Sequence, residues 1–451
     1  MEKKIPEIPI WRVFLNIPRL FKDPIKVIDE SFKRYGDTYI THPGGQYRSV
    51  ITTNTNLIQH ILQKNHSNYE KSPLQTDVLA KYLGYGLLTT NGSYWLQQRR
   101  LIQPGFHKRK LEGLNNIMQT SILRFCDDLE ERLKSKSEFD MSELMTEVTL
   151  HVVAQSLFST GITQEHIERL GNDVTILQRA IVKDVRLPMF KWWRKINGEQ
   201  TYYEKKAKEA HGLIMDIITA RKEQGEEHDD LLDMLLGVRY ADTNEPMTDQ
   251  QVLEESLVLM VAGHETSANA MTWLFYLLSQ NPEILSTLES EVEENPRDHL
   301  SMQEAMELTL ISNAVSESMR LFPPAWITDR VAIEDDECEG VKIKKGDVIA
   351  PYIYGVHRDE KNWNEPLKFN PTRFDKSNIK AKPNYSYFPF GGGPRLCIGQ
   401  SFALLEMQLL VYHLLKRFEF EFIEYQKVEM EPLVTLRPKN PMMMRIRKRI
   451  K

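Results

Sequence analysis

The most constraining feature of this sequence is a run of twelve residues, 388–399, which reads FPFGGGPRLCIG. It contains four glycines and two prolines, so it cannot form a regular helix or strand. Three consecutive glycines also allow the backbone to pass close to something flat or bulky. We therefore expect an irregular loop that carries a cysteine, Cys397, near its end.

Cys397 stands directly before a strongly helical run, GQSFALLEMQLLVYHLLKRF. A thiolate at the N-terminus of a helix is stabilised by the helix dipole and by free N–H groups. Arg395, two residues earlier, adds a positive charge. Most single cysteines are buried and inert, but the loop and the helix together favour a cysteine with a chemical role.

The composition is that of an ordinary globular protein, with 41% hydrophobic residues and a formal net charge of −5 over 451 residues. This balance excludes a disordered chain and a basic nucleic-acid binder. The three cysteines, Cys126, Cys338 and Cys397, are too few and too scattered for a disulfide framework or a zinc site. We expect a cytoplasmic protein in a reducing setting.

The most apolar stretch, residues 257–278, is long enough to raise the question of a membrane span. His264, Glu265 and Asn269 lie in its middle, and a charged acid is costly in lipid. The N-terminal apolar stretch is short and interrupted by prolines, unlike a signal peptide. We expect a core helix at 257–278 and no transmembrane segment.

Secondary-structure signals are unevenly distributed along the chain. The strand-like runs DTYITH and YRSVITT flank Pro43-Gly44-Gly45 and predict a β-hairpin. Hydrophobic periodicity predicts one helix over 303–321, ended by Pro323-Pro324, and strand signals return at 340–354. The sequence thus predicts a mostly α protein with small β-sheets. We expect a single domain over 1–451, with β-rich parts near 36–53 and 325–355 and helical parts near 54–322 and 399–418.

Five residues of the cysteine loop match the pattern F-x-x-G-x-R-x-C-x-G: Phe390, Gly393, Arg395, Cys397 and Gly399. This is the haem-binding signature of the cytochrome P450 superfamily, which the sequence resembles over essentially its whole length. The resemblance implies the P450 fold, with haem b between a long central helix and the cysteine loop. It also implies that Cys397 is the thiolate ligand of the iron, a ligand that favours O–O cleavage. Gly393 and Gly399 would keep the loop close to the porphyrin, and Phe390 would shield the sulfur.

Glu317 and Arg320 share one face of the predicted 303–321 helix. Alone, such a pair is a common helical ion pair. In the family these two residues join an arginine that matches Arg373, and the resulting buried triad is taken to brace the cysteine loop. Because buried charges are costly unless all are paired, we expect a structural role for the three.

Several arginines match family positions that contact the haem propionates. Trp95 and Arg99 resemble one such pair, and Arg330 and Arg395 match two further positions. Haem carries two carboxylates, so a buried haem needs several donors of this kind. A solvated surface arginine is the alternative for each.

Residues 262–266, AGHET, lie midway along a helix predicted over about 254–280. A glycine, an acid and a β-branched hydroxyl are poor choices for an apolar helix centre, and Thr266 can donate to the carbonyl of Ala262. The pattern is similar to the family's oxygen-binding groove, which implies that Glu265 and Thr266 deliver protons to bound dioxygen. A helix kink with a solvated acid is the alternative. His264 is expected to be structural.

The resemblance implies a monooxygenase that inserts one atom of O2 into an unactivated C–H bond, with two electrons and two protons. The rivals are a peroxygenase driven by hydrogen peroxide and a non-catalytic haem protein that senses or carries a ligand. An intact Glu265-Thr266 pair argues against both. We expect a monomer.

Electrons are expected to come from a separate ferredoxin or flavodoxin with its NAD(P)H-dependent reductase. The sequence has no cysteine cluster for an iron–sulfur centre and no G-x-G-x-x-G after a strand, and residues 398–451 are too few for a flavin domain. Because such carriers are usually acidic, basic residues are the candidate contacts, although a solvated charge run is the alternative: Arg100, Lys108, Arg109 and Lys110.

The expected substrate pocket is almost wholly apolar. By family position its walls come from residues 72–88, Met260, Ala262, Ala325, Trp326, Ile327 and the segment 433–436, which includes Leu436. The runs LFPPAWI and TLRP look similar to bacterial carotene hydroxylases, so we expect a carotenoid or another terpenoid. A fatty-acid hydroxylase is the alternative, and the cations that could hold a carboxylate are Arg48, Lys71 and Lys81.

Overall fold

The computed structural model describes residues 5–43, 47–186, 190–225 and 228–450. Helices dominate these residues, and the strands form small sheets, so the fold is mostly α with small β-sheets, as predicted. The chain groups into two compact units. The first unit is Met1–Ser72, Ser316–Ile398 and Val428–Lys439, and the second is Pro73–Val315, Gly399–Lys427 and Asn440–Lys451. The single domain predicted over the whole chain stays a prediction.

The first unit is organised around a five-stranded sheet with the strand order β1-β2-β8-β5-β3. Its strands are β1 (Thr38–Thr41), β2 (Ser49–Thr52), β3 (Tyr69–Glu70), β5 (Arg330–Ala332) and β8 (Val348–Pro351). Two-stranded sheets add β6 (Asp336–Cys338) with β7 (Val341–Ile343), and β10 (Met430–Pro432) with β11 (Leu436–Pro438). The helical elements are α1 (Ile10–Lys22), α2 (Pro24–Tyr35), α3 (Thr55–Gln59), η2 (His60–Lys64), η3 (His66–Asn68), α16 (Ile353–Val356), η8 (Pro371–Phe374), α17 (Lys376–Lys380) and η9 (Gly393–Arg395).

The predicted hairpin is confirmed. β1 and β2 pair antiparallel, with Tyr39 opposite Ile51. Gly44 and Gly45 of its predicted turn lie outside the described residues. The strands predicted within 340–354 are present as β7 and β8, and β8 pairs parallel to β2.

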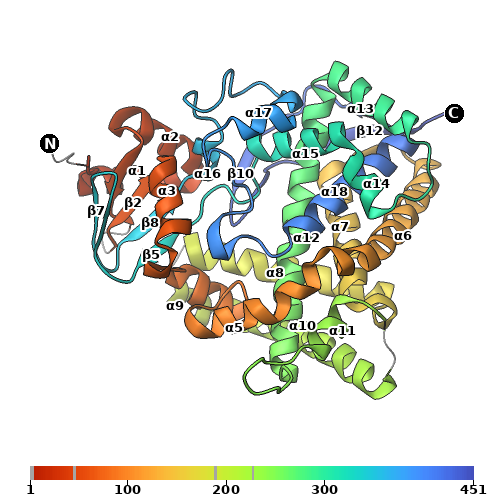
Figure 1. Cartoon of the computed structure of the whole chain (residues 1–451), viewed down its shortest axis with the longest axis horizontal. Helices are drawn as coiled ribbons and strands as arrows, with labels where there is room; N and C mark the ends of the chain where they lie inside the picture. Colours follow the sequence, from red (N-terminus) through yellow and green to blue (C-terminus); the bar gives the residue numbers. More distant parts are fainter. Residues whose placement is uncertain (1–4, 44–46, 187–189, 226–227, 451) are drawn as a thin grey trace. The chain divides into compact units, whose positions relative to one another are not determined.

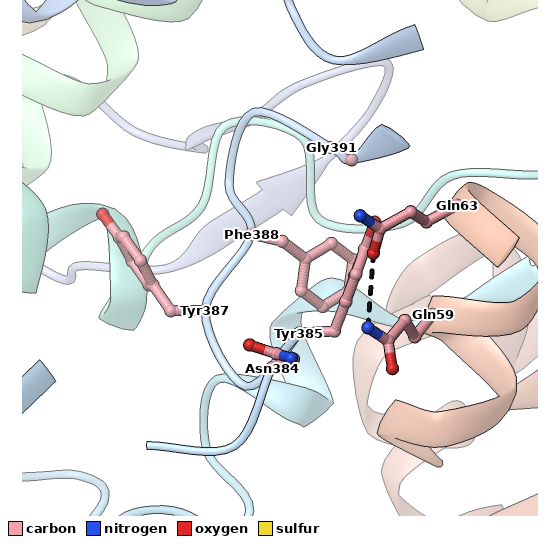
Figure 2. A pocket seen from close by; sticks show the side chains of 8 residues that line it. Gln59, Gln63, Asn384, Tyr385, Tyr387, Phe388 and Gly391 are labelled. Carbon is pink, nitrogen blue, oxygen red and sulfur yellow. Dashed lines mark hydrogen bonds between the residues drawn. The ribbon is translucent and has the colours of Figure 1, made fainter. Parts of the chain in front are cut away.

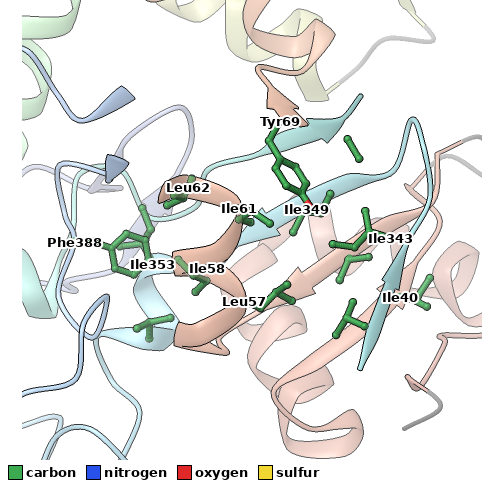
Figure 3. Close-up of a cluster of buried hydrophobic side chains, with 14 residues drawn as sticks. Ile40, Leu57, Ile58, Ile61, Leu62, Tyr69, Ile343, Ile349, Ile353 and Phe388 are labelled. Atoms are coloured by element: carbon green, nitrogen blue, oxygen red, sulfur yellow. The ribbon is translucent and has the colours of Figure 1, made fainter. Parts of the chain in front are cut away.

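The two faces of this sheet are both covered by helices. Successive residues of a strand point to opposite faces. Ile40 and Val50 therefore join Leu57 of α3 in one buried apolar cluster (Figure 3). Tyr39 points the other way and meets Phe32 of α2, with the ring centroids 5.1 Å apart. Cover on both faces explains why all four residues of β1 are buried.

The second unit is built on α12 (Asp249–Ser279), the long green helix in Figure 1. It packs against α7 (Met141–Phe158) and α10 (Glu199–Gln224), and most of its side chains are buried. The helix starts earlier than predicted because Thr248 and Gln251 form a capping box that satisfies its first N–H groups. Within the described ranges, no helix has the length and apolar character needed to cross a membrane.

The helix predicted over 303–321 is wrong in one respect, since it is two helices, α14 (Met302–Glu307) and α15 (Thr309–Leu321). Leu308 between them has a non-helical ψ of 76°. The carboxylate of Glu291 accepts hydrogen bonds from the N–H groups of Leu310 (2.9 Å) and Ile311 (2.8 Å). This side chain from α13 (Pro282–Glu294) caps a new helix start, which a local periodicity signal cannot reveal.

The final predicted helix is present as α18 (Gln400–Arg417), within one residue of the expected bounds at each end. The other helical elements of the second unit are η4 (Leu74–Leu79), α4 (Ala80–Leu83), α5 (Gly92–Ile102), η5 (Gln103–Phe106), α6 (Lys108–Leu133), η6 (Ser159–Gly161), α8 (Gln164–Arg186), α9 (Lys191–Ile196) and α11 (Leu231–Gly237). A three-stranded sheet, in the order β4-β12-β9, contains β4 (Glu138–Asp140), β9 (Phe418–Phe422) and β12 (Met443–Lys448).

Glu406 of α18 is a fully buried carboxyl, 0% exposed. Burial raises the pKa of Glu406 to about 8, and the hydroxyl of Ser267 on α12 offsets only part of this shift. In the unfolded chain the group titrates near 4.5. Between these two pH values the folded protein holds a proton that the unfolded chain has lost, so this group lowers stability progressively as pH rises from about 4.5 to about 8.

We predict that Glu406→Gln stabilises the protein by an amount that grows with pH over this window, reaching about 3 kcal/mol at pH 7. The amide keeps the size of the side chain and removes the need to take up a proton on folding. Urea unfolding of both proteins at pH 5, 6, 7 and 8 measures the difference. Glu424→Gln, at an exposed position, is the matched control and is expected to show none. A difference between Glu406→Gln and the parent that does not change with pH would contradict the prediction.

Candidate functional site

The cysteine loop of the first unit is closed by hydrogen bonds within its own backbone. The N–H of Cys397 donates to the carbonyl of Phe390 at 3.0 Å, and the N–H of Leu396 donates to that of Gly393 at 3.0 Å. The Cys397 side chain is exposed at the end of this turn. The loop therefore presents one thiol outward from a closed backbone turn.

Gly393 lies against the backbone of η2. Its φ is +65°, and a Cβ built on it would stand 1.8 Å from the carbonyl oxygen of Leu62. Only glycine fits this position, for both its conformation and its space. The sequence motif marked the glycine correctly, but Leu62 carried no signal of its own.

Glu317, Arg320 and Arg373 meet in one buried network of the first unit. Arg320 is 0% exposed, and its Nε and Nη2 donate to the Glu317 carboxylate at 2.6 and 2.9 Å. Its Nη1 donates to the carbonyls of His357 (2.7 Å) and Pro366 (2.8 Å). Arg373 Nε reaches the same carboxylate at 3.2 Å. With its charge paired and its donors used, Arg320 holds the irregular stretch after α16 in place.

His357 connects this network to the cysteine loop. Its Nε2 accepts a hydrogen bond from the N–H of Phe388, at the start of the loop, at 3.0 Å. Burial, together with the charges of Arg320 and Arg358, holds the pKa of His357 well below its usual range. The ring is therefore neutral and its Nε2 can accept. Sequence reasoning missed His357, because it lies in an irregular stretch without periodicity.

Arg330 and Arg395 are two desolvated cations of the first unit. Burial, and then the charge of Arg330, lower the pKa of Arg395 to about 10, while Glu70 opposes the shift. Burial also lowers the pKa of Arg330, and the negative charge of Asp329 opposes this shift. Arg330 Nη1 donates a hydrogen bond to the backbone carbonyl of Asp329 at 2.6 Å. Two desolvated guanidinium groups that repel each other favour an anion beside them. An outward thiol and this cation pair fit a haem, with its iron and two carboxylates.

The centre of α12 in the second unit carries the AGHET segment. Thr266 Oγ1 donates to the carbonyl of Ala262 at 2.8 Å, the back-bonded turn expected from the sequence. A Cβ on Gly263 would stand 3.0 Å from Val153 of α7. Ala262 itself is exposed on the helix surface. The glycine thus allows close packing on α7, while Ala262 and Thr266 share the exposed side of this turn.

Glu265 is oriented by a residue that sequence reasoning missed. Gln178 of α8 donates from Nε2 to Glu265 Oε2 at 2.8 Å. The neighbouring His264 is buried, with Nδ1 3.0 Å from the Met260 carbonyl oxygen. Burial lowers the pKa of His264, which favours the neutral ring. Because a carbonyl oxygen only accepts, Nδ1 carries the proton of this hydrogen bond. His264 therefore has a structural role within the helix. Glu265 is the acid of this segment, and its carboxylate accepts a hydrogen bond from the Gln178 side chain.

Most of the remaining predicted residues are buried. Trp95 of α5 is buried, and Arg99 one turn later bonds Gln103 through Nε at 3.2 Å. Trp326 of the first unit is 8% exposed, and its Nε1 donates to the Leu433 carbonyl at 3.0 Å. Trp326 shares one buried apolar cluster with Leu436 and Ile327. Ala325 packs against a second apolar cluster. Met260 of α12 is fully buried. Their assignment to a substrate pocket stays a prediction.

A family model and several known proteins match this chain over most of its length. Residues 5–445 match the family model described as Cytochrome P450. A Mycobacterium tuberculosis protein named as cytochrome P450 132 is 32% identical over 87% of this chain and 86% of its own. In Arabidopsis thaliana, a cytokinin hydroxylase is 30% identical over 90% of this chain and 80% of its own. The chloroplastic protein LUTEIN DEFICIENT 5 of the same plant is 28% identical over 87% and 68%. The chain therefore belongs to the cytochrome P450 family and is a cytochrome P450 monooxygenase.

Proposed function

We propose that this monooxygenase hydroxylates an unactivated C–H bond of a long neutral substrate, a carotenoid or another terpenoid. The observation that carries the substrate class is the pairing of two of the three cations that could otherwise hold a carboxylate. Arg48 forms an ion pair with Asp347, and Lys81 with Asp184 at 3.2 Å. Lys71 is buried. A fatty acid would have to break one of these arrangements, whereas a neutral hydrocarbon needs none of them.

Apolar burial supports the same substrate class. A long hydrocarbon gains about 25 cal/mol for each Å² that it removes from water, while an exposed ion pair contributes about 0–1 kcal/mol. The relative LUTEIN DEFICIENT 5 bears the name of lutein, which is a carotenoid. Both considerations favour a neutral terpenoid over a fatty acid.

The family binds haem, and we assign haem b to the residues described above. Cys397 would supply the thiolate ligand, and Arg330, Arg395, Trp95 and Arg99 would hold the propionates. When bound, the haem supplies the activation of dioxygen and the transfer of one oxygen atom to carbon. The protein supplies the thiolate, the orientation of the cofactor and the delivery of protons.

Proton delivery is assigned to Glu265 and Thr266. The Gln178 amide donates to one carboxylate oxygen of Glu265 and so holds this acid group in a defined orientation. The Thr266 hydroxyl donates a hydrogen bond to the Ala262 carbonyl. A hydroxyl can donate one proton and accept another, so Thr266 can act as a proton relay. A positioned acid and hydroxyl of this kind contribute about 10²–10⁴-fold to a proton-transfer step.

Electrons come from a redox partner, which we propose is a separate acidic ferredoxin or flavodoxin. Arg100 of α5 and Lys108 and Arg109 of α6 are exposed basic residues of the second unit. Lys110, the fourth candidate, is paired with Asp229. Complementary charge of this kind steers association and raises the rate of encounter.

The assignment of the iron ligand is tested by Cys397→Ser. We predict that the variant loses the absorption band typical of thiolate-ligated haem in the reduced carbon monoxide complex. The serine hydroxyl is a hard oxygen ligand and cannot replace the soft thiolate sulfur. Cys338→Ser, at a partly exposed cysteine of the same unit, is the control and keeps the band. Retention of the band in Cys397→Ser would show that another residue is the ligand.

The proton relay is tested by Thr266→Ala. We predict that the haem and substrate still bind, but that product formed per NAD(P)H falls at least about tenfold and hydrogen peroxide rises. Thr272→Ala is a matched control, because Thr272 on the same helix donates to the Ala268 carbonyl at 2.7 Å in the same way. Equal coupling in Thr266→Ala and Thr272→Ala would remove Thr266 from the relay.

The substrate class is tested by titrating β-carotene and long-chain fatty acids in parallel, following the haem absorption. We predict that β-carotene binds more tightly and that Arg48→Ala changes neither affinity tenfold, since Arg48 already pairs with Asp347. Tighter binding of fatty acids, weakened at least about tenfold (1.4 kcal/mol) by Arg48→Ala, would favour a fatty-acid hydroxylase. Binding without turnover in the presence of a reductase system would favour a haem-binding sensor.

A further inference from the structure

The helix α1 of the first unit exposes several large apolar side chains (Figure 1). Trp11 is 57% exposed and Leu15 is 69% exposed, and three further residues of the helix are exposed with them: Ile10, Phe14 and Phe21. Among the other described residues of this unit, exposed large apolar side chains lie singly along the sequence: Tyr47, Ile333, Leu367 and Val434. Single exposed apolar residues are common on proteins, whereas a contiguous apolar patch marks an interaction surface.

The five exposed apolar residues of α1 lie on one face of the helix, which we call the apolar face of α1. At about 100° between successive residues, they fall within an arc of about 140° around the helix axis. Val13 lies outside this arc and is buried in a cluster with Ile8 and Tyr39. The helix is therefore held on the first unit by another side, and its apolar face is left to solvent.

The pocket beside the cysteine loop of the same unit has the opposite character. It holds about 340 Å³, and its wall presents the side-chain amides of Gln59, Gln63 and Asn384 (Figure 2). Gln59 Nε2 donates to Gln63 Oε1 at 3.3 Å. Amide groups of this kind are readily hydrated, so the pocket needs no apolar partner. The apolar face of α1, by contrast, gains free energy when it leaves water.

Positive charge borders the apolar face. Residues 10–35, which include α1 and α2, carry six Lys and Arg against three Asp and Glu, in a chain whose formal net charge is −5. The sequence of α1 contains Arg12, Arg19 and Lys22 and no acid. Glu30 of α2 pairs with Arg19 at 2.6 Å, and Lys22 is exposed. An excess of cations beside an apolar helix face favours an anionic lipid surface as the partner.

The length of α1 decides how it can meet a bilayer. The helix has 13 residues, whereas a helix that spans a bilayer needs about 20. A short helix with Trp, Phe and Leu on one side and Arg and Lys beside them instead lies in the plane of the headgroups. Trp11 suits that region, because an indole ring is apolar and its N–H is polar.

We propose that α1 binds the surface of a bilayer that contains anionic phospholipid, with its apolar face inserted among the headgroups and its cations near the phosphates. This inference goes beyond the proposed hydroxylation, and it does not depend on which substrate is bound. A long neutral hydrocarbon dissolves in the same bilayers, so an enzyme bound at this surface is close to such a substrate.

The test is vesicle flotation of the full-length, haem-loaded protein. One set of vesicles contains phosphatidylcholine and phosphatidylglycerol in equal parts, and the other contains phosphatidylcholine alone. We expect the parent protein to float with the mixed vesicles and to bind phosphatidylcholine more weakly. The double variant Trp11→Ser, Leu15→Ser is expected to bind the mixed vesicles at least about tenfold more weakly, because it lacks the two most exposed side chains of the apolar face.

Leu367→Ser is the matched control. Leu367 is 75% exposed in the same unit but lies outside α1, so this variant is expected to bind the vesicles like the parent. Equal urea unfolding midpoints are expected for the parent and these variants, since the replaced side chains are exposed. Lys22→Glu leaves the apolar face intact, and we expect it to weaken binding to the mixed vesicles and to leave binding to phosphatidylcholine unchanged.

Four results would overturn the proposal. They are a parent protein that does not float with the mixed vesicles, a double variant that binds as tightly as the parent, an equal loss of binding in Leu367→Ser, and unchanged binding in Lys22→Glu. Sedimentation without vesicles tests the other occupant of this face. A parent that forms dimers and a double variant that stays monomeric would assign the apolar face to a second copy of the chain, and this also overturns the lipid proposal.

Discussion

The buried ion pair between Glu317 and Arg320 is the interaction on which the cysteine loop depends. Both side chains are 0% exposed, and an unpaired charge there would cost several kcal/mol. Arg320 offsets that cost by bonding backbone carbonyls after α16, including that of His357. His357 in turn accepts from Phe388 at the start of the loop. One ion pair is thereby linked, through backbone and a neutral histidine, to the turn that presents Cys397.

Two glycines of the cysteine loop allow other parts of the first unit to pack closely against its backbone. Gly393 lets the backbone approach Leu62, and Gly392 leaves room for Tyr385. The glycine-rich sequence suggested close approach to something flat or bulky. In the first unit, the groups that approach these two glycines include a carbonyl group and an aromatic ring of the chain itself. The glycines therefore serve the packing of the loop on its own scaffold, besides any contact with a porphyrin.

Sequence reasoning identified features that depend on local pattern. The hairpin of β1 and β2, the long α12 and the final α18 all follow from hydrophobic period or turn residues, and the structure contains each. The cysteine loop was recognised because its glycines, arginine and cysteine have fixed spacing. Each of these patterns lies within a contiguous stretch of residues, so the sequence alone reveals it.

Features that arise from distant partners could not be found in this way. The break at Leu308 exists because Glu291 on another helix caps the start of α15. Gln178 orients Glu265 from α8, and nothing in the sequence around it signals that role. Cations suggested for a carboxylate, such as Arg48, have acidic partners far along the chain. Each of these requires knowledge of which segments meet.

The central claim is that Cys397 binds the haem iron as a thiolate. X-ray absorption at the iron edge tests it most directly, since sulfur in the first coordination shell is distinguishable from nitrogen or oxygen. The account predicts one sulfur neighbour in the haem-loaded parent protein and none in Cys397→Ser. An iron surrounded only by nitrogen and oxygen in the parent, or a sulfur that persists in the variant, would contradict it.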